Sequence, residues 1–389
     1  MNKKITLGLA LSLVMIASAV TFILTSFFTL QSFNEKVVDV NEKSKKYNSL
    51  NSVDAYVREH YYGDIDDKVL SNGTLKGLIS SLGDPYSKYL TPEEYEAEQS
   101  SEEGSQTGLG LTLTEDSSGY IRITDILPDS PAAEEGLTSD DIIVRIDDKD
   151  IHSIGFSDAM NEMQGNEGSS IKLTIRRNGI DTDYTFKRRS IDIQSVSGKM
   201  TNGYIGYIQI AGFRKNTPDQ FLDQLGSLTA NGAKSLIIDL RGNEGGLITA
   251  LEECADPLLP EGVIATAEYK DGHTDTIVYS DDNKLDIPVI VIVDKDTAST
   301  AELFAAALRD FCKAQIVGVK TRGNGTIQET EKMDDGGAIV LTVAECKTAV
   351  SEQSYNGTGI VPDVIVENND AQNSDPQFDA AVELAMTSR

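Results

Sequence analysis

The chain has 389 residues, of which 39% are hydrophobic and 25% charged, and its formal net charge at pH 7 is −28. A chain of this length supports two or three domains, and so acidic a balance argues against nucleic acid as a partner, because phosphate binding needs basic patches. The three cysteines, Cys254, Cys312 and Cys346, are too widely spaced to indicate a metal site or a disulfide framework. We therefore expect no metal and no other cofactor, and we interpret the acidity as a solubility feature of an extracytoplasmic protein.

The N-terminal segment, residues 5–30, carries no charged side chain. It is long enough to cross a bilayer, which takes about 20 residues. Lys3 and Lys4 precede it, which predicts a single-pass anchor over residues 1–30 in the cell membrane, with the N-terminus cytoplasmic and the bulk of the chain outside. The alternative is a cleaved signal peptide, because the small residues A-S-A stand at 17–19. The apolar run continues past them to Leu30, which favours the anchor.

Two polar and helical segments follow the apolar run. Residues 31–50 are polar and are typical of a helical or flexible stalk. Residues 51–103 predict an N-terminal helical region with turn signals between the helices. The helical spacing is visible at Leu75, Leu78, Ile79 and Leu82.

Residues 104–190 predict a small β-rich domain. The loop T-G-L-G-L-T-L at 107–113 leads into a strand, a short helix is expected at 130–133, and a second helix at 156–163. This order of loop, strand and helix resembles a PDZ domain, which implies that backbone N–H groups of the loop capture a peptide's C-terminal carboxylate while the peptide adds to the sheet edge. The peptide-binding residues that the resemblance implies are Gly108, Leu109, Gly110 and Leu111.

Residues 191–389 alternate strand and helix patterns, which predicts an α/β domain with a mixed sheet flanked by helices. The segment L-I-I-D-L-R-G-N-E-G-G-L at 236–247 is typical of a buried parallel strand followed by a loop whose glycines allow close backbone approach to a ligand. A second buried strand is expected at 287–294 and a helix from Ala301, which places Ser299 in the turn between them.

Ser299 allows two interpretations. A serine at a strand-to-helix turn can expose its hydroxyl, and the helix N-terminus behind it attracts developing negative charge. Alternatively Ser299 only caps the helix, with Glu302 three residues later completing a capping box.

Three segments together favour the first interpretation. D-T-A-S-T-A-E at 296–302, D-L-R-G-N-E-G-G at 239–246 and G-V-K-T-R-G-N-G-T-I-Q at 318–328 resemble motifs of the C-terminal processing peptidase (tail-specific protease) family of serine peptidases. The segments at 84–95 and 359–363 match the same family, so the resemblance covers nearly all of residues 50–389. It implies a ClpP/crotonase-like mixed sheet core flanked by helices, with an inserted PDZ domain.

The resemblance assigns roles to particular positions. Ser299 falls on the nucleophile, Asn324 on the lysine that serves as the base, and Gln328 on the glutamine that orients this lysine. The oxyanion donors that it implies are the backbone N–H groups of Gly245, Gly246 and Thr300. Glu244 stands where the family has a proline, and the charge beside the expected oxyanion hole opposes catalysis if the side chain points inward.

The asparagine at position 324 predicts impaired catalysis. A serine hydroxyl needs a neighbour that takes its proton, and a carboxamide cannot accept one. General-base assistance is worth roughly 100- to 10,000-fold in rate. Lys320 and Asp310 are the alternative bases, although a structural role is favoured for each; Arg322 cannot deprotonate.

Two functions remain open. The chain is either a membrane-anchored serine endopeptidase with impaired catalysis, or an inactive pseudopeptidase that acts as a peptide-binding adaptor or regulator. The sequence also leaves open an ordinary protease in which Asn324 is an altered residue. In each case we expect protein or peptide partners with free C-termini, the membrane, and possible homo-oligomers.

Overall fold

The computed structural model describes residues 15, 18, 20–22, 24–26, 47–281, 284–351, 354–368 and 374–387. The chain divides into two compact units, Met1–Thr74 and Leu75–Arg389. The expected anchor over residues 1–30 and the stalk up to residue 46 lie almost entirely outside the described residues. Among the residues that are described, no helix is both long and apolar enough to span a bilayer.

In the first unit, residues 47–60 are helical. Helix α2 (Asp67–Ser80) begins in this unit and ends in the second. The Asp66 carboxylate accepts the N–H groups of Lys68 at 2.8 Å and Val69 at 3.1 Å, which satisfies donors that the first turn of a helix leaves unpaired.

The second unit contains a six-stranded mixed sheet with the strand order β10-β11-β12-β15-β16-β19. The first pair is antiparallel and the others are parallel. The strands are β10 (Val196–Thr201), β11 (Ile205–Ile210), β12 (Ser235–Asp239), β15 (Val289–Val293), β16 (Gln315–Gly318) and β19 (Val364–Ile365). Every residue of β12 and β15 is buried, as expected for parallel strands covered on both faces.

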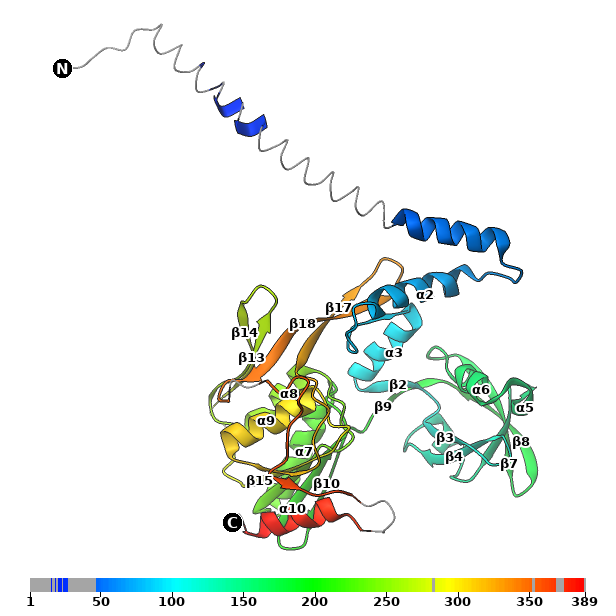
Figure 1. The fold of residues 1–389 in the computed structure, drawn as a ribbon. Helices are drawn as coiled ribbons and strands as arrows, with labels where there is room; N and C mark the ends of the chain where they lie inside the picture. The colour runs from blue at the N-terminus through cyan, green and yellow to red at the C-terminus, as the bar shows by residue number, and fades with distance from the viewer. Residues whose placement is uncertain are drawn as a thin grey trace, which may run out of the picture. The chain divides into compact units, whose positions relative to one another are not determined.

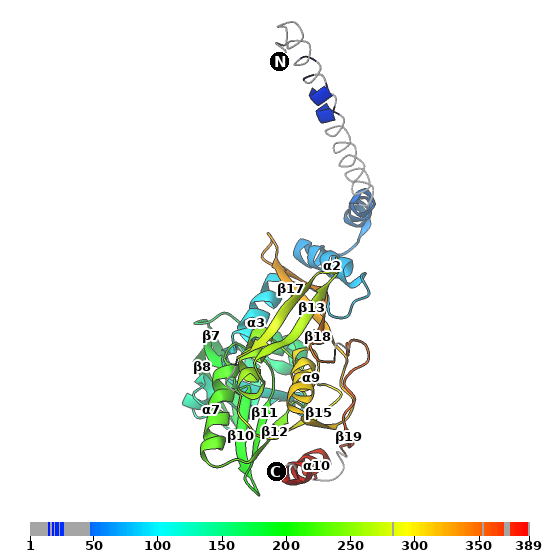
Figure 2. The ribbon, with the colours of Figure 1, turned by 90° about the vertical axis from the view of Figure 1, so that its left-hand side faces the viewer.

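Helices cover both faces of this sheet (Figures 1 and 2). One face packs against α7 (Thr217–Ala230), α8 (Ile248–Ala255) and α9 (Thr300–Cys312), with Phe221 and Phe304 in its core. A short 3-10 helix, Asp256–Leu258, follows α8. The other face packs against α10 (Pro376–Thr387). The predicted mixed α/β sheet flanked by helices is therefore confirmed.

A second, smaller sheet stands at one side of this core. Its strands are β1 (Lys88–Leu90), β13 (Gly262–Tyr269), β14 (Thr274–Ser280), β17 (Thr326–Lys332) and β18 (Ala338–Thr348). Strand β18 pairs with β1, β13 and β17, all antiparallel. Helix α3 (Pro92–Glu102) follows β1 and starts with a capping box formed by Thr91 and Glu94.

The PDZ-like part of the second unit has a hydrophobic core of its own. Strand β2 (Ser105–Gly108) pairs with β9 (Arg189–Asp192), which brings together the two ends of residues 104–190. Between them lie β3 (Leu111–Glu115), β4 (Ile121–Ile126), β5 (Ile142–Ile146), β6 (Lys149–Asp150), β7 (Ser170–Arg177) and β8 (Ile180–Lys187). Its helices are α4 (Pro131–Glu134), α5 (Ile151–Ile154) and α6 (Phe156–Met163). The helix expected at 156–163 is thus present.

Candidate active site

Ser299 occupies the turn between strand β15 and helix α9. Its backbone angles are φ 55° and ψ −123°, a region that non-glycine residues rarely adopt and that stores strain. Ser299 is also the N-cap of α9, and its N–H donates to the Glu302 carboxylate at 3.0 Å. The two interpretations of Ser299 therefore do not exclude each other, because one sharp turn both caps the helix and presents the serine.

The glycine loop at 245–246 lies directly against this turn. A β-carbon on Gly245 would lie 2.9 Å from Cβ of Ser299 and 3.0 Å from the Thr300 nitrogen, and φ is +105° there, so only glycine fits. The Thr300 hydroxyl donates to the Gly246 carbonyl at 2.7 Å. The loop and the first turn of α9 are thereby held together.

Gly245 is not a free oxyanion donor, contrary to the expectation from sequence. Its N–H already donates at 2.8 Å to Oδ1 of Asn243, a fully buried side chain whose Nδ2 donates to the Ile210 carbonyl at 2.9 Å. Within the described residues, the N–H groups of Gly246 and Thr300 have no acceptor. These two amides are the donors that remain available to a substrate oxygen.

Asn324 lies between strands β16 and β17 and lines the same cavity as Ser299. It is 6% exposed, and its backbone N–H donates to the Glu302 carboxylate at 2.8 Å. Its side-chain Oδ1 accepts the Thr326 N–H at 3.3 Å and the Thr326 hydroxyl at 2.7 Å. In this part of the structure no hydrogen bond joins Asn324 to Ser299.

Gln328 reaches position 324 only through Thr326. Its Nε2 donates to Oγ1 of Thr326 at 2.8 Å and to Oγ1 of Thr342 at 3.1 Å. The family resemblance assigns no role to Thr326, although the two-residue period of a strand places residues 326 and 328 on one face of β17. Thr326 therefore links the two side chains that the family resemblance joins directly.

Glu302 is the second residue whose role the sequence analysis missed, since it appeared there only as part of a cap. Its carboxylate is fully buried and accepts the N–H of Ser299, the hydroxyl of Thr321, and the N–H groups of Gly323 and Asn324, the last two at 2.8 Å. It therefore joins the turn at Ser299 to the segment 321–324.

The cavity that contains Ser299 and Asn324 has a volume of about 640 Å³. Gly246, Thr300 and Gln328 line it as well. Among its charged lining residues, Lys88 pairs with Glu98 at 2.7 Å and Arg322 with Glu244 at 2.7 Å. Burial and the neighbouring Glu98 charge raise the pKa of Glu102, which also lines the cavity.

Neither alternative base is placed at Ser299. Lys320 and Asp310 are not among the residues that line the cavity, and Asp310 accepts the Thr348 hydroxyl instead. Lys88 does line it, but its amine is paired with the Glu98 carboxylate at 2.7 Å. Glu244 also lines the cavity, where its side chain is 70% exposed and its charge is paired with Arg322.

In the PDZ-like part, the loop that the sequence singled out has free amides. Within the described residues the N–H groups of Leu109 and Gly110 donate to no acceptor, while their carbonyls accept the N–H groups of Ala132 and Leu127 at 3.1 and 2.9 Å. Strand β3 begins at Leu111 and is an edge strand of its sheet. The side chain of Leu109 is 3% exposed and packs in the core, so its backbone N–H is the group that remains available to a peptide.

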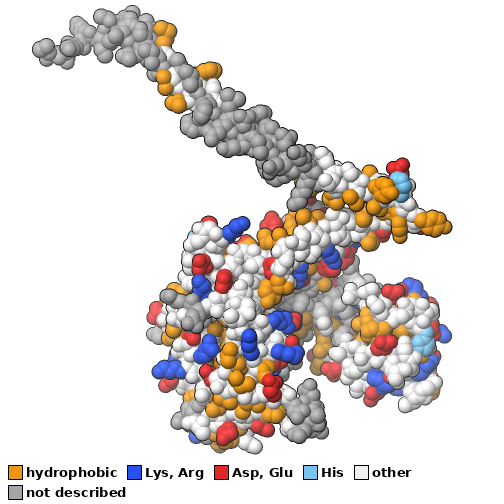
Figure 3. Space-filling model, viewed as in Figure 1, with side chains coloured by type: hydrophobic (Ala, Val, Ile, Leu, Met, Phe, Trp, Pro, Cys, Tyr) orange, Lys and Arg blue, Asp and Glu red, His pale blue; other side chains and the backbone are white. Residues whose placement is uncertain are grey.

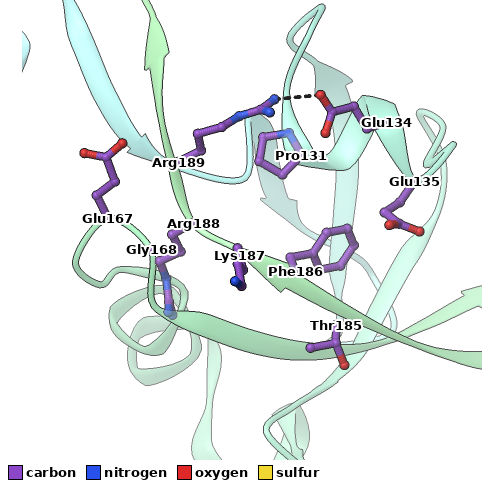
Figure 4. A pocket seen from close by; sticks show the side chains of 10 residues that line it. All are labelled: Pro131, Glu134, Glu135, Glu167, Gly168, Thr185, Phe186, Lys187, Arg188 and Arg189. Atoms are coloured by element: carbon purple, nitrogen blue, oxygen red, sulfur yellow. Dashed lines mark hydrogen bonds and ion pairs between the residues drawn. The ribbon is translucent and has the colours of Figure 1, made fainter.

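A separate cavity of about 400 Å³ lies elsewhere on the PDZ-like part (Figure 4). Pro131 and Phe186 form its apolar walls, and Arg189 pairs with Glu134 at 3.0 Å at its edge. Its walls come from α4, β8 and the loop at 167–168, and not from β3 and α6, which flank the expected peptide groove. Side chains of both charges are intermingled on the face of the molecule that Figure 3 shows.

A PDZ domain next to an α/β domain with a serine at a strained strand-to-helix turn defines a PDZ-containing peptidase fold. Family models agree with this: the Peptidase family S41 model matches residues 204–366, the PDZ domain model residues 98–176, and the activating protease CtpB N-terminal domain model residues 14–94. The carboxy-terminal processing protease CtpA of Bacillus subtilis is 33% identical over 91% of this chain and 76% of that protein. The chain belongs to peptidase family S41, among the relatives of these C-terminal processing proteases.

Other relatives and solved structures agree with this family and fold. A probable CtpA-like serine protease of Staphylococcus aureus is 28% identical over 89% of this chain and 71% of that protein. A photosystem II D1 C-terminal processing protease shares the fold with a TM-score of 0.50 and 24% identity over 84% of this chain and 88% of that chain. A putative S41 protease from Bacteroides fragilis has a TM-score of 0.52 and 17% identity over 85% and 92%.

Proposed function

We propose that this chain is a membrane-anchored, extracytoplasmic C-terminal processing serine peptidase with impaired catalysis, which binds the C-termini of proteins or peptides through its PDZ domain. One observation carries the proposal of impairment. The cavity around Ser299 has two free oxyanion donors, yet residue 324 offers no basic nitrogen, since its side chain is a carboxamide held by Thr326.

In the proposed reaction the Ser299 hydroxyl attacks the carbonyl of the scissile bond. The N–H groups of Gly246 and Thr300 hold the oxyanion that forms, and donors of this kind are worth roughly 100- to 1,000-fold each. In the described part of the cavity no amine or carboxylate is hydrogen-bonded to the Ser299 hydroxyl, so we expect the hydroxyl proton to leave to water. Formation of the acyl-enzyme is therefore the step that we expect to be slow.

The alternative function is a pseudopeptidase that binds peptides as an adaptor or regulator. The Asn324 side chain favours this function as well, because peptide binding needs no base. It needs only the free amides of Leu109 and Gly110 and the free edge of β3. The two functions differ only in whether Ser299 turns over a peptide.

A labelling experiment separates them. The full chain is treated with a fluorophosphonate probe, with Ser299→Ala as the control. Slow labelling that Ser299→Ala abolishes supports the impaired peptidase, and a complete lack of labelling supports the pseudopeptidase. Labelling as fast as that of an ordinary serine peptidase contradicts the proposed impairment.

The PDZ part of the proposal is tested with a peptide that has a free C-terminal carboxylate and with its C-terminal amide. The amide should bind at least tenfold more weakly if the loop amides capture the carboxylate. Equal binding of both peptides contradicts this part.

The proposed anchor is tested by alkaline carbonate extraction of membranes, which should leave the full chain in the pellet and release a variant that starts at residue 47.

A further inference from the structure

The side-chain amide of Asn324 has one defined orientation. A backbone N–H can only donate, so the atom of the Asn324 amide that faces the Thr326 N–H must be the carbonyl oxygen, Oδ1. The Thr326 hydroxyl donates to the same oxygen and accepts from Gln328. The amide is therefore fixed in one orientation, with Nδ2 on the side away from Thr326.

That nitrogen is left without a partner. Within the described residues Nδ2 of Asn324 donates no hydrogen bond, although Asn324 is only 6% exposed. The described polar side-chain atoms that are both sealed from solvent and unpaired are Nε of Arg214 and Oδ1 of Asn216. Nδ2 is not one of them, so it has contact with solvent, and Asn324 lines the cavity at Ser299.

Backbone hydrogen-bond donors line the same cavity. The free N–H groups of Gly246 and Thr300 lie at the cavity, and the second of these stands at the N-terminus of the 13-residue helix α9, which favours negative charge. The buried Glu302 carboxylate already accepts four donors, so it has no need of another. Three glutamates also line the cavity: Glu98 and Glu244 are each paired with a cation, and burial and the Glu98 charge raise the pKa of Glu102.

From this arrangement we propose that the cavity at Ser299 is a second receptor for the terminal carboxylate of a peptide, with Asn324 Nδ2 as the residue-specific donor. A carboxylate accepts several hydrogen bonds and carries the charge that α9 favours, whereas the carbonyl of an uncut peptide bond is neutral. The substitution at position 324 thus replaces a group that takes a proton by one that binds an anion. The inference rests on the proposed function, since the ligand is the same class of peptide.

The test counts carboxylate sites on the full chain by isothermal titration calorimetry. The probe is an N-acetylated Ala-Ala-Ser-Ala-Ala peptide with a free C-terminus, compared with its C-terminal amide. The parent is compared with Asn324→Leu, which keeps the size but cannot donate, and with Asn324→Asp, which replaces the donor by a charge that repels the ligand. Asn202→Asp, on an exposed turn, adds the same charge elsewhere as the matched control.

We expect the parent and Asn202→Asp to bind two equivalents of the acid and Asn324→Leu to bind one, with the lost site weakened roughly tenfold or more. Asn324→Asp should lose the same site more completely; if it fails to fold, Asn324→Leu decides. If the parent binds one equivalent of the acid peptide and both Asn324 variants bind none, the result also supports the inference. That result would count against the PDZ site. Identical stoichiometry and affinity in the parent and in Asn324→Leu would overturn it.

Discussion

The buried carboxylate of Glu302 accepts the backbone N–H of Asn324 at 2.8 Å and so ties the position of the expected base to the helix that begins behind Ser299. The same carboxylate accepts the Ser299 N–H at 3.0 Å. One side chain thus sets the distance between two segments of the chain that carry the proposed chemistry. The contribution of Glu302 is structural, because it binds the backbone N–H of residue 324 and does not depend on the side chain there.

Glu302→Gln should destabilise the protein. An amide keeps one acceptor oxygen but turns an NH₂ group toward backbone N–H donors, and each buried donor left unpaired costs about 1–3 kcal/mol. We expect a loss of at least that size in the free energy of unfolding, measured with denaturant. The control Glu331→Gln, on the exposed part of β17, should change it by less than about 0.5 kcal/mol. Equal stability of the two variants would show that the carboxylate is dispensable.

Gly246→Ala should be much more damaging than Gly242→Ala. A β-carbon at Gly246 would lie 2.1 Å from the Phe213 carbonyl oxygen, whereas one at Gly242 meets nothing within 4 Å. Both glycines have positive φ, +135° at Gly246 and +68° at Gly242. Gly242→Ala should therefore cost only the backbone strain, about 1–2 kcal/mol, without a steric clash. Thermal unfolding measures the difference. If Gly242→Ala melts as low as Gly246→Ala, the close packing of the loop at 245–246 on Phe213 does not matter for stability.

The hydrogen bond from the Tyr89 hydroxyl to Asp335, 2.7 Å long, should make stability depend on pH at both extremes. Burial, and then this hydrogen bond, raises the pKa of Tyr89 to about 12, and the same bond lowers the pKa of Asp335. The raised tyrosine pKa stabilises the fold below about 10, the ordinary value, and that contribution is lost as pH rises through the folded pKa. The lowered aspartate pKa stabilises it above about 4 and is lost as pH falls through the depressed value.

Tyr89→Phe removes this interaction, so the parent should be the more stable protein by a constant margin between about pH 5 and pH 9. The margin should shrink as pH falls below about 4, the ordinary aspartate value, and through the depressed pKa of Asp335. Denaturant titrations of both proteins across this range give the margin directly. A margin that grows on acidification would have the wrong sign for this explanation.

Much of the fold could be predicted from the sequence, because it depends on local patterns. The buried runs of β12 and β15, the helix after Ser299 and the helix at 156–163 follow from hydrophobic spacing and turn residues. The cavity that unites Ser299 with residue 324 needed the family resemblance, because the two segments are separated in sequence and meet only in the folded sheet.

The details that set the chemistry could not be predicted in this way. Gly245 donates to Asn243, Thr326 stands between Asn324 and Gln328, and Leu109 turns its side chain into the core. Each of these depends on which of several nearby acceptors or spaces the backbone approaches, and a residue pattern does not contain that information. The pairing of Glu244 with Arg322 is of the same kind.

The central claim, that the serine is presented but lacks a base, is tested most directly by Asn324→Lys. The full chain, the revertant and the double variant Asn324→Lys with Ser299→Ala are assayed side by side on an unstructured peptide with a free C-terminus, and cleavage is followed by mass spectrometry. A working general base should raise the rate roughly 100- to 10,000-fold over the parent, and the double variant should lose this gain. A parent that cleaves as fast as the revertant, and stops when Ser299 alone becomes alanine, would contradict the account.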